Sequence, residues 1–335
     1  MMRPALELGA KCTRSTTDPH KRKARSIAKF KLSLTSAATT LSAMTFRQHA
    51  LATLSVSFMA LHLAMWCVGL VVLEIVRLLI PPTTRSVRRI AARMYHLAVR
   101  TDNWWLRRVV GVQWNIPAVD VGPGRIAVVI SNHRSWSDTL LAQSVICAHG
   151  PILKFLAKQE LVYVPILGII VLSFEFPRLK RKASQAQSEE QRRESDRARV
   201  TEAALSLRET RAALMSFVEG TRFTEAKRIE LNSPFQHLLP PRAGGFSAIV
   251  DAVRDHDAVV VDLTLNYEPD VSFWQFIGGV HTHVTIHAAS FPADQLPGDL
   301  RGWLWQRWEE KEGLLAQGRN LGHPTPTKQH GGALR

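Results

Sequence analysis

The stretch VVISNHRSWSDTLL, residues 128–141, decides the fold because it changes character in the middle. Its first residues are apolar and mostly β-branched, which predicts a short buried strand. A polar turn follows, and a helix is expected to begin near Asp138, with Ser135 and Ser137 as candidate caps. A strand that runs through a short turn into a helix is typical of a sheet with parallel strands.

Three further stretches repeat this pattern along the chain. Residues 212–221, 258–269 and 283–291 are apolar, β-rich and bounded by turn residues, and helical stretches lie between them. Such alternation predicts an α/β fold with a mostly parallel sheet flanked by helices. Residues 183–211 are rich in Gln, Glu, Arg, Ala and Ser and are expected to form one exposed helix.

A long apolar run precedes this domain. Residues 50–73 contain no Asp, Glu, Lys or Arg, and a helix that crosses a bilayer needs about 20 apolar residues. We therefore expect one N-terminal transmembrane or membrane-embedded helix over residues 45–82, ended by Pro81 and Pro82. A buried core helix is the alternative. A signal peptide is disfavoured because the run is too long and no small-residue cleavage site follows.

The net charge of +15 favours a polyanionic partner: nucleic acid, an anionic membrane surface or a phosphorylated small molecule. Residues 1–44 carry nine basic and two acidic side chains with little patterning, so we expect disorder there. Met44 is an alternative start, and a basic targeting segment is the rival interpretation. Five arginines that follow the apolar run would line one side of a helix and favour the cytoplasmic side of a membrane: Arg85, Arg88, Arg89, Arg93 and Arg100.

His133 and Asp138 are the first candidate site residues. Positions five apart on a regular helix do not meet, but a turn that enters a helix can fold them together. Neutral His133 would then accept a proton from a hydroxyl, while Asp138 would fix its tautomer and stabilise the imidazolium. No Ser or Cys nucleophile is needed if the hydroxyl of an acceptor attacks directly.

The second candidate segment is SFVEGTRFTEAK, residues 216–227. Gly220 permits a tight turn after a strand. Arg222 offers a fork of donors suited to phosphate oxygens, and Thr221 can add a hydroxyl. Glu219 is expected to hold Arg222 or backbone donors in place. An ordinary β-turn with a surface ion pair is the alternative.

These two segments together resemble the 1-acylglycerol-3-phosphate acyltransferase family, which carries Asn-His, four residues and Asp, and later Phe-x-Glu-Gly-Thr-Arg. The resemblance covers residues 95–315. FEFPRLKR, residues 174–181, is similar to the family's arginine block, which meets the acceptor phosphate, and Arg181 is the counterpart. LLPPRAGGFSAIV, residues 238–250, is similar to a further family segment.

Within the family the chain is most similar to the branch of bacterial inner-membrane and lysocardiolipin-type acyltransferases. Arg242 stands in the place of a family lysine. The chain also departs from the family pattern where Val218 replaces a Pro of many members, where Asp262 replaces a Pro that is frequent in the fourth block, and where Arg178 adds a charge to the second block. These departures bear on substrate choice more than on the reaction.

The resemblance implies that an acyl group passes from acyl-CoA or acyl carrier protein to a lysophospholipid such as 1-acyl-sn-glycerol-3-phosphate, giving phosphatidic acid. His133 and Asp138 would be catalytic, and the substrate-binding residues would be Glu219, Gly220, Thr221, Arg222 and Arg181. The implied location is the bacterial inner membrane, with the acyltransferase domain of residues 83–320 on the cytoplasmic side and a disordered tail at 321–335. The rival classes are a nucleic-acid-binding protein, an inactive membrane scaffold and a serine hydrolase, whose G-x-S-x-G motif is missing.

No metal or cofactor is expected. The three cysteines lie far apart and form no C-x-x-C pair, which fits a reducing compartment. His281, His283 and His287 lie on one face of a predicted strand, but no nearby carboxylate or cysteine completes a metal site.

Overall fold

A computed structural model describes residues 44–122, 125–158, 162–179, 212–280 and 282–321, and six single positions between 194 and 207. Four of the predictions fall wholly or mostly outside these residues. They are the disordered segment before residue 44, the role of Arg181, the exposed helix over 183–211 and the tail after residue 321.

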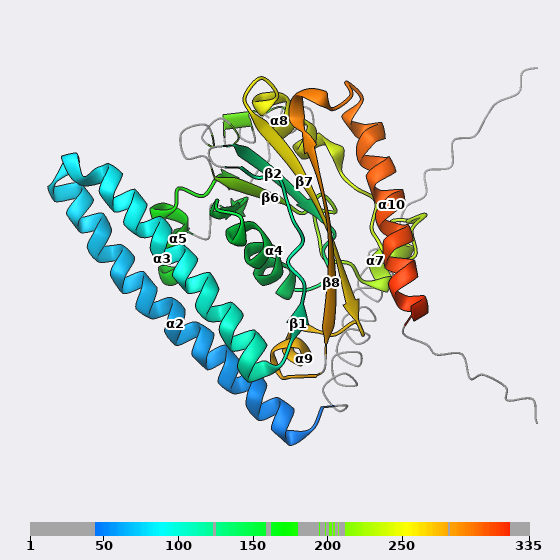
Figure 1. Cartoon of the computed structure of the whole chain (residues 1–335), viewed down its shortest axis with the longest axis horizontal. Helices are drawn as coiled ribbons and strands as arrows, with labels where there is room; N and C mark the ends of the chain where they lie inside the picture. Colours follow the sequence, from blue (N-terminus) through cyan, green and yellow to red (C-terminus); the bar gives the residue numbers. More distant parts are fainter. Residues whose placement is uncertain are drawn as a thin grey trace, which may run out of the picture. The chain divides into compact units, whose positions relative to one another are not determined.

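Within the described residues, six strands form the central sheet in the order β1–β8–β7–β2–β6–β3 (Figure 1). All neighbouring pairs are parallel except β7 and β8, which are antiparallel. The prediction of an α/β fold with a mostly parallel sheet is therefore confirmed. The strands are β1 (Gln113–Trp114), β2 (Ile126–Ser131), β3 (Leu153–Phe155), β6 (Ala213–Ser216), β7 (Ala258–Glu268) and β8 (His283–Pro292).

Helices cover both faces of this sheet, which explains why β2 and β6 are buried along their whole length. One face packs against α4 (Ser137–Ala148), and the other packs against α8 (Ala243–Val253) and α10 (Leu300–Leu321). The remaining elements are short: η2 (Leu106–Val110), α5 (Pro165–Ser173), α7 (Glu225–Glu230), α9 (Phe273–Ile277), η4 (Ala293–Gln295) and a small parallel pair, β4 (Ala157–Lys158) with β5 (Arg178–Leu179).

The apolar run forms α2 (Phe46–Leu79), a helix of 34 residues, and η1 (Pro81–Thr83) follows it. Its mean hydropathy reaches 2.2, and only 11% of its most apolar window is buried, unlike the core helix of a soluble protein. Large apolar side chains lie exposed along it, among them Leu54, Leu61, Met65, Val68, Val72 and Leu79.

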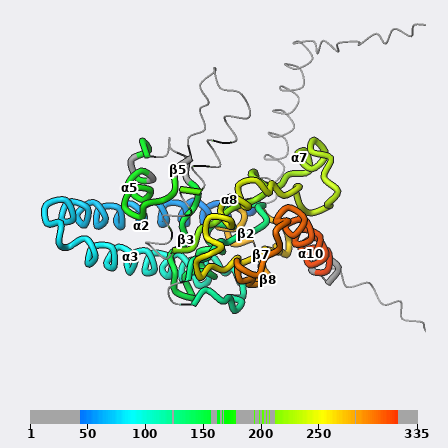
Figure 2. Tube along the Cα trace, turned by 90° about the horizontal axis from the view of Figure 1, so that it is seen from above, coloured from blue at the N-terminus to red at the C-terminus, as the bar shows by residue number. Residues whose placement is uncertain are grey.

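The next helix, α3 (Thr84–Trp105), runs back along α2, and Figures 1 and 2 show the two side by side. Contacts join them at both ends: Phe58 stacks on Trp105 at 3.9 Å, and Leu70 shares a buried cluster with Ala91. Between these, His62 Nδ1 lies 3.1 Å from Asp102 Oδ1. The apolar side of α3 packs on the α/β domain, and the hydroxyl of its Tyr95 donates to the Leu153 carbonyl at 2.7 Å.

Candidate active site

The turn between β2 and α4 brings His133 and Asp138 together. His133 Nδ1 lies 2.8 Å from Asp138 Oδ2. Asp138 is fully buried, and the His133 side chain is 15% exposed. No hydrogen bond to His133 Nε2 is found among the described residues, and Nδ1 is the nitrogen that faces Asp138.

Asp138 also organises the turn itself. Its Oδ2 accepts from the backbone N–H of Arg134 at 2.6 Å and of Ser135 at 2.9 Å. Of the two expected caps of α4, the Ser135 hydroxyl makes a long contact: its Oγ accepts from the backbone N–H of Ser137, the first residue of the helix, at 3.4 Å. Trp136 stands at the N-cap position and makes no side-chain capping bond. The Asp138 carboxylate instead accepts from the two backbone N–H groups of the turn that precedes α4.

Tyr267, at the end of β7, is a site residue that sequence reasoning missed. Its hydroxyl donates to Asp138 Oδ1 and lies 2.9 Å from the Ser137 hydroxyl. Burial and the neighbouring Asp138 carboxylate raise the Tyr267 pKa well above its usual value, so the phenol keeps its proton. Both carboxylate oxygens of Asp138 therefore have partners. In the sequence, the signal that could have pointed to Tyr267 was a tyrosine near the end of an apolar strand.

The second motif lies beside the first because β6 and β2 are parallel neighbours whose carboxyl ends meet. Phe217, directly after β6, stacks on the His133 ring with centroids 3.9 Å apart. The backbone N–H of Phe223 donates to the His133 carbonyl at 2.7 Å. The turn over residues 219–222 is thus tied to the histidine from both of its ends.

Gly220 takes φ = 71°, a conformation that a side chain disfavours, and this supports the expected tight turn. Glu219 is 1% exposed, and neither carboxylate oxygen has a hydrogen-bond partner among the described residues. Glu219 was expected to hold Arg222 or backbone donors. No contact joins it to Arg222 among the described residues, and the second alternative has support from the backbone of His133, which favours the charged form of this carboxyl. Burial raises the Glu219 pKa to about 8, although the backbone of His133 and the charges of Arg134 and Lys311 act in the opposite direction.

Basic side chains surround this turn. The Arg222 guanidinium is exposed and lies 5.0 Å from the centre of the Trp136 ring. Lys227, at the start of α7, donates to Thr221 Oγ1 at 2.6 Å and to the Arg222 carbonyl at 2.9 Å. Arg242 lies against Gly220 and is also exposed. Lys227 and Trp136 were not among the predicted site residues.

The structure therefore brings His133, Asp138, Glu219, Gly220 and the Thr221–Arg222 pair into one region. Arg181 lies outside the described residues, as does His281. Within the part of the chain that the structure describes, no group of three His, Cys, Asp or Glu side chains is arranged to hold a metal ion.

Comparison with known proteins finds relatives of this chain. Residues 109–266 match a family model described as "Acyltransferase". The chain is 30% identical over 203 residues to 1-acyl-sn-glycerol-3-phosphate acyltransferase delta from Bos taurus, which covers 56% of this chain and 51% of that protein. It is 28% identical over 268 residues to the delta protein from Mus musculus, covering 73% of this chain and 68% of that protein.

Lysocardiolipin acyltransferase 1 from Mus musculus is 27% identical over 230 residues, covering 63% of this chain and 58% of that protein. The matched region thus spans about half to two thirds of the length of these relatives. Among solved structures, the 1-acyl-sn-glycerophosphate (LPA) acyltransferase PlsC from Thermotoga maritima aligns with a TM-score of 0.44 and 14% identity, over 80% of this chain and 100% of that one.

Proposed function

Since the chain belongs to the 1-acylglycerol-3-phosphate acyltransferase family, we propose that it moves a fatty acyl group from a thioester to the free hydroxyl of a lysophospholipid. The acceptor is 1-acyl-sn-glycerol-3-phosphate or a close relative, and the product is phosphatidic acid or the matching phospholipid. The donor is acyl-CoA or acyl carrier protein. The observation that carries the proposal is the contact of 2.8 Å between His133 Nδ1 and Asp138.

This contact supports a general-base mechanism. With Nδ1 donating to Asp138, Nε2 of neutral His133 carries the lone pair that accepts the proton of the acceptor hydroxyl. The hydroxyl oxygen attacks the thioester carbonyl carbon and forms a tetrahedral oxyanion. The C–S bond then breaks, and the imidazolium returns its proton to the departing sulfur. The products are an ester and a free thiol, so atoms and charges balance without a covalent enzyme intermediate.

The acceptor phosphate has a fitting partner in Arg222. Its guanidinium is exposed, carries no ion pair to a described residue and follows the turn that is tied to His133. Lys227 adds a second positive charge beside Thr221. Arginine forks bind phosphate oxygens through paired, charge-assisted hydrogen bonds, so we assign the phosphate to Arg222 and Thr221, with Lys227 in support. We keep Arg181 in this assignment, but only on the basis of the sequence, because the structure does not describe this residue.

We also propose that α2 holds the protein on a membrane and lies along the membrane surface. Because α2 packs along the length of α3, and α3 packs on the α/β domain, a membrane-crossing α2 would carry the arginines of α3 into the hydrocarbon. An in-plane α2 instead buries its exposed apolar side chains while the domain stays in water. The cytoplasmic face of a bacterial inner membrane remains the proposed location.

The deciding experiment is acyl transfer by purified membranes that carry this protein. Radiolabelled oleoyl-CoA is supplied with lysophosphatidic acid, and membranes with His133→Ala are run alongside. Labelled phosphatidic acid from wild type alone would support both the reaction and the base. Equal product from both membranes would remove His133 from the mechanism. Salt-dependent DNA binding without any acyl transfer would favour the nucleic-acid alternative.

A further inference from the structure

Trp136 is a large apolar side chain that lies in solvent beside the candidate active site. It is 59% exposed and stands at the N-cap position of α4, between His133 and Asp138 in the sequence. Exposure alone does not indicate a role, since single apolar side chains are common on protein surfaces. What distinguishes Trp136 is its partner, which is a charged residue of the other motif.

That partner is Arg222. The carbon of its guanidinium lies 5.0 Å from the centre of the Trp136 ring, inside the range of about 6 Å over which an aromatic face attracts a cation. Tryptophan is the aromatic side chain that attracts a cation most strongly. The backbone N–H of Phe223 already ties this turn to the His133 carbonyl at 2.7 Å. The ring contact is therefore not needed to hold the two turns together, and its effect falls on the Arg222 side chain.

Arg222 forms no ion pair with a described residue, and a second cation lies close to it. Lys227 donates to the Arg222 carbonyl at 2.9 Å and to Thr221 Oγ1 at 2.6 Å. Burial lowers the Lys227 pKa, and the charge of Arg222 acts in the same direction, although Glu219 and Glu230 oppose the shift. Two like charges this close favour an anion beside them, such as a phosphate.

An arginine side chain that is free to change rotamer loses conformational entropy when it binds a phosphate. An aromatic ring against the guanidinium restricts these rotamers before the phosphate arrives. The attraction between cation and ring is electrostatic and needs no hydrogen bond from Arg222, so its N–H donors stay available to phosphate oxygens. Trp136 can thus order Arg222 without competing for its hydrogen bonds.

We propose that Trp136 is a positioning residue for the acceptor phosphate, and that it acts by holding the Arg222 guanidinium against its ring before the acceptor binds. This inference rests on the function proposed above, in which Arg222 binds that phosphate. Phosphate is bound in the ground state and in the transition state alike, so loss of the ring weakens acceptor binding and leaves the chemical step unchanged. An exposed cation–π contact corresponds to a change of about two- to fivefold in binding.

The test is a double-mutant cycle with the purified full chain in mixed micelles, with oleoyl-CoA at saturation and lysophosphatidic acid varied. Trp136→Leu removes the ring, and it should raise the acceptor KM about two- to fivefold at an unchanged kcat. Trp136→Phe keeps an aromatic face and should recover part of that loss. In the Arg222→Gln background, where the cation is gone, Trp136→Leu should raise the KM no further.

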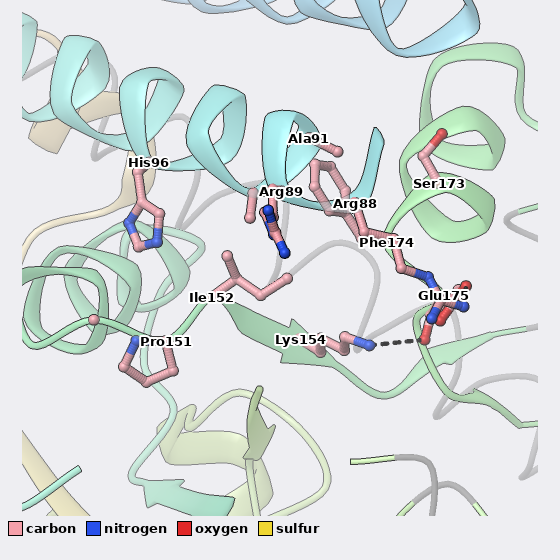
Figure 3. Close-up of a pocket in the computed structure, with 12 residues that line it drawn as sticks. Arg88, Arg89, Ala91, His96, Pro151, Ile152, Lys154, Ser173, Phe174 and Glu175 are labelled. Carbon is pink, nitrogen blue, oxygen red and sulfur yellow. Dashed lines mark hydrogen bonds and ion pairs between the residues drawn. The ribbon is translucent and has the colours of Figure 1, made fainter. Parts of the chain in front are cut away.

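Two matched controls come from surfaces away from this site. Trp104→Leu removes another exposed tryptophan, because Trp104 is 55% exposed and lies on α3. Arg89→Gln removes another exposed arginine. Figure 3 shows Arg89 on α3 beside a cavity of about 330 Å³, and none of the residues that line this cavity belongs to the turns of Trp136 and Arg222. Both controls should keep the wild-type KM, and Trp136→Leu should have its full effect in the Arg89→Gln background.

An unchanged KM in Trp136→Leu would overturn the proposal, and so would an equal rise of KM in wild type and in the Arg222→Gln background. An equal rise in Trp104→Leu would assign the effect to surface tryptophans in general. A fall in kcat alone would place Trp136 with the catalytic pair instead, which also overturns the proposal.

Failure of the proposed function looks different, since wild type itself would then yield no phosphatidic acid. In that case the same cycle is measured as binding of radiolabelled lysophosphatidic acid without an acyl donor. Weaker binding by Trp136→Leu, absent in the Arg222→Gln background, would still support the role of the ring. Equal binding by wild type and Trp136→Leu would overturn it.

Discussion

Oδ2 of Asp138 lies 2.8 Å from Nδ1 of His133, so the imidazole directs Nε2 away from this carboxylate. The same carboxylate accepts two backbone N–H groups and the Tyr267 hydroxyl. The histidine is therefore fixed in one tautomer and one orientation before a substrate arrives. The proposed mechanism depends on this orientation.

Replacement of Asp138 by Asn should lower kcat by at least about 100-fold, within the range that general-base catalysis contributes. The amide can donate to Nδ1 and so favours the wrong tautomer, with the proton on Nε2. Initial rates at saturating acceptor test this. Asp257→Asn is the matched control, because Asp257 pairs with Arg125 at the opposite end of the strands. A variant at position 138 with near wild-type kcat would contradict the assigned role.

Tyr267→Phe should lower kcat about tenfold, as expected for one lost hydrogen bond to a buried carboxylate. The ring keeps its packing on Phe276, so the acceptor KM should change little. Tyr163→Phe is a suitable control, since Tyr163 is 81% exposed. If both variants retain the wild-type kcat, Tyr267 has no part in orienting Asp138.

Glu219 should make stability depend on pH. Its pKa is about 8 in the folded chain and near 4.5 when unfolded, so the folded state keeps a proton that the unfolded state loses between these values. Stability is therefore full below pH 4.5 and falls as pH rises towards 8, by about 1.4 kcal/mol per pH unit from this group. Glu219→Gln should flatten that slope when denaturant unfolding is followed at pH 5, 6 and 7. An unchanged slope would mean that Glu219 is already ionised.

The topology of α2 can be tested with single cysteines. In a background where Cys12, Cys67 and Cys147 are replaced by Ala, Arg47→Cys and Arg85→Cys mark the two ends of the helix. An in-plane α2 leaves both ends on the same side, so an impermeant maleimide should label both in inverted vesicles and neither in right-side-out vesicles. Labelling of the two ends from opposite sides would establish a membrane-crossing helix instead.

The sequence predicted the parts of the fold that rest on long, regular patterns. The apolar runs that form β2, β6, β7 and β8 were recognisable. In contrast, β1 and β3 have only two and three residues, which is too short for a periodic pattern of apolar residues to show. The local pair of His133 and Asp138 was found because a turn brings near neighbours together. Tyr267 and Lys227 were missed because their contacts depend on which strands and helices become neighbours.

Asp262 illustrates the same limit. In the sequence, Asp262 was a departure from the Pro that is frequent at this position in the family, and we interpreted it as a residue that bears on substrate choice. In the structure it is buried in β7, where Arg307 donates to its Oδ2 at 2.8 Å and Lys311 forms an ion pair with its other oxygen. Lys311 is fully buried and also donates to the Leu263 carbonyl at 2.5 Å. Both residues that pair with Asp262, Arg307 and Lys311, lie on α10, far along the chain, so no local pattern reveals them.

This buried pair gives the last prediction. Lys311→Met removes the ammonium and leaves Asp262 with one partner, which should lower the free energy of unfolding by about 3–5 kcal/mol. The double variant Lys311→Met with Asp262→Leu removes both charges of the pair and should recover most of that loss, because Asp262 is no longer a buried charge and Arg307 keeps Glu310 as a partner. Denaturant midpoints of wild type, both single variants and the double variant measure the coupling. Additive losses would show that the two side chains act independently.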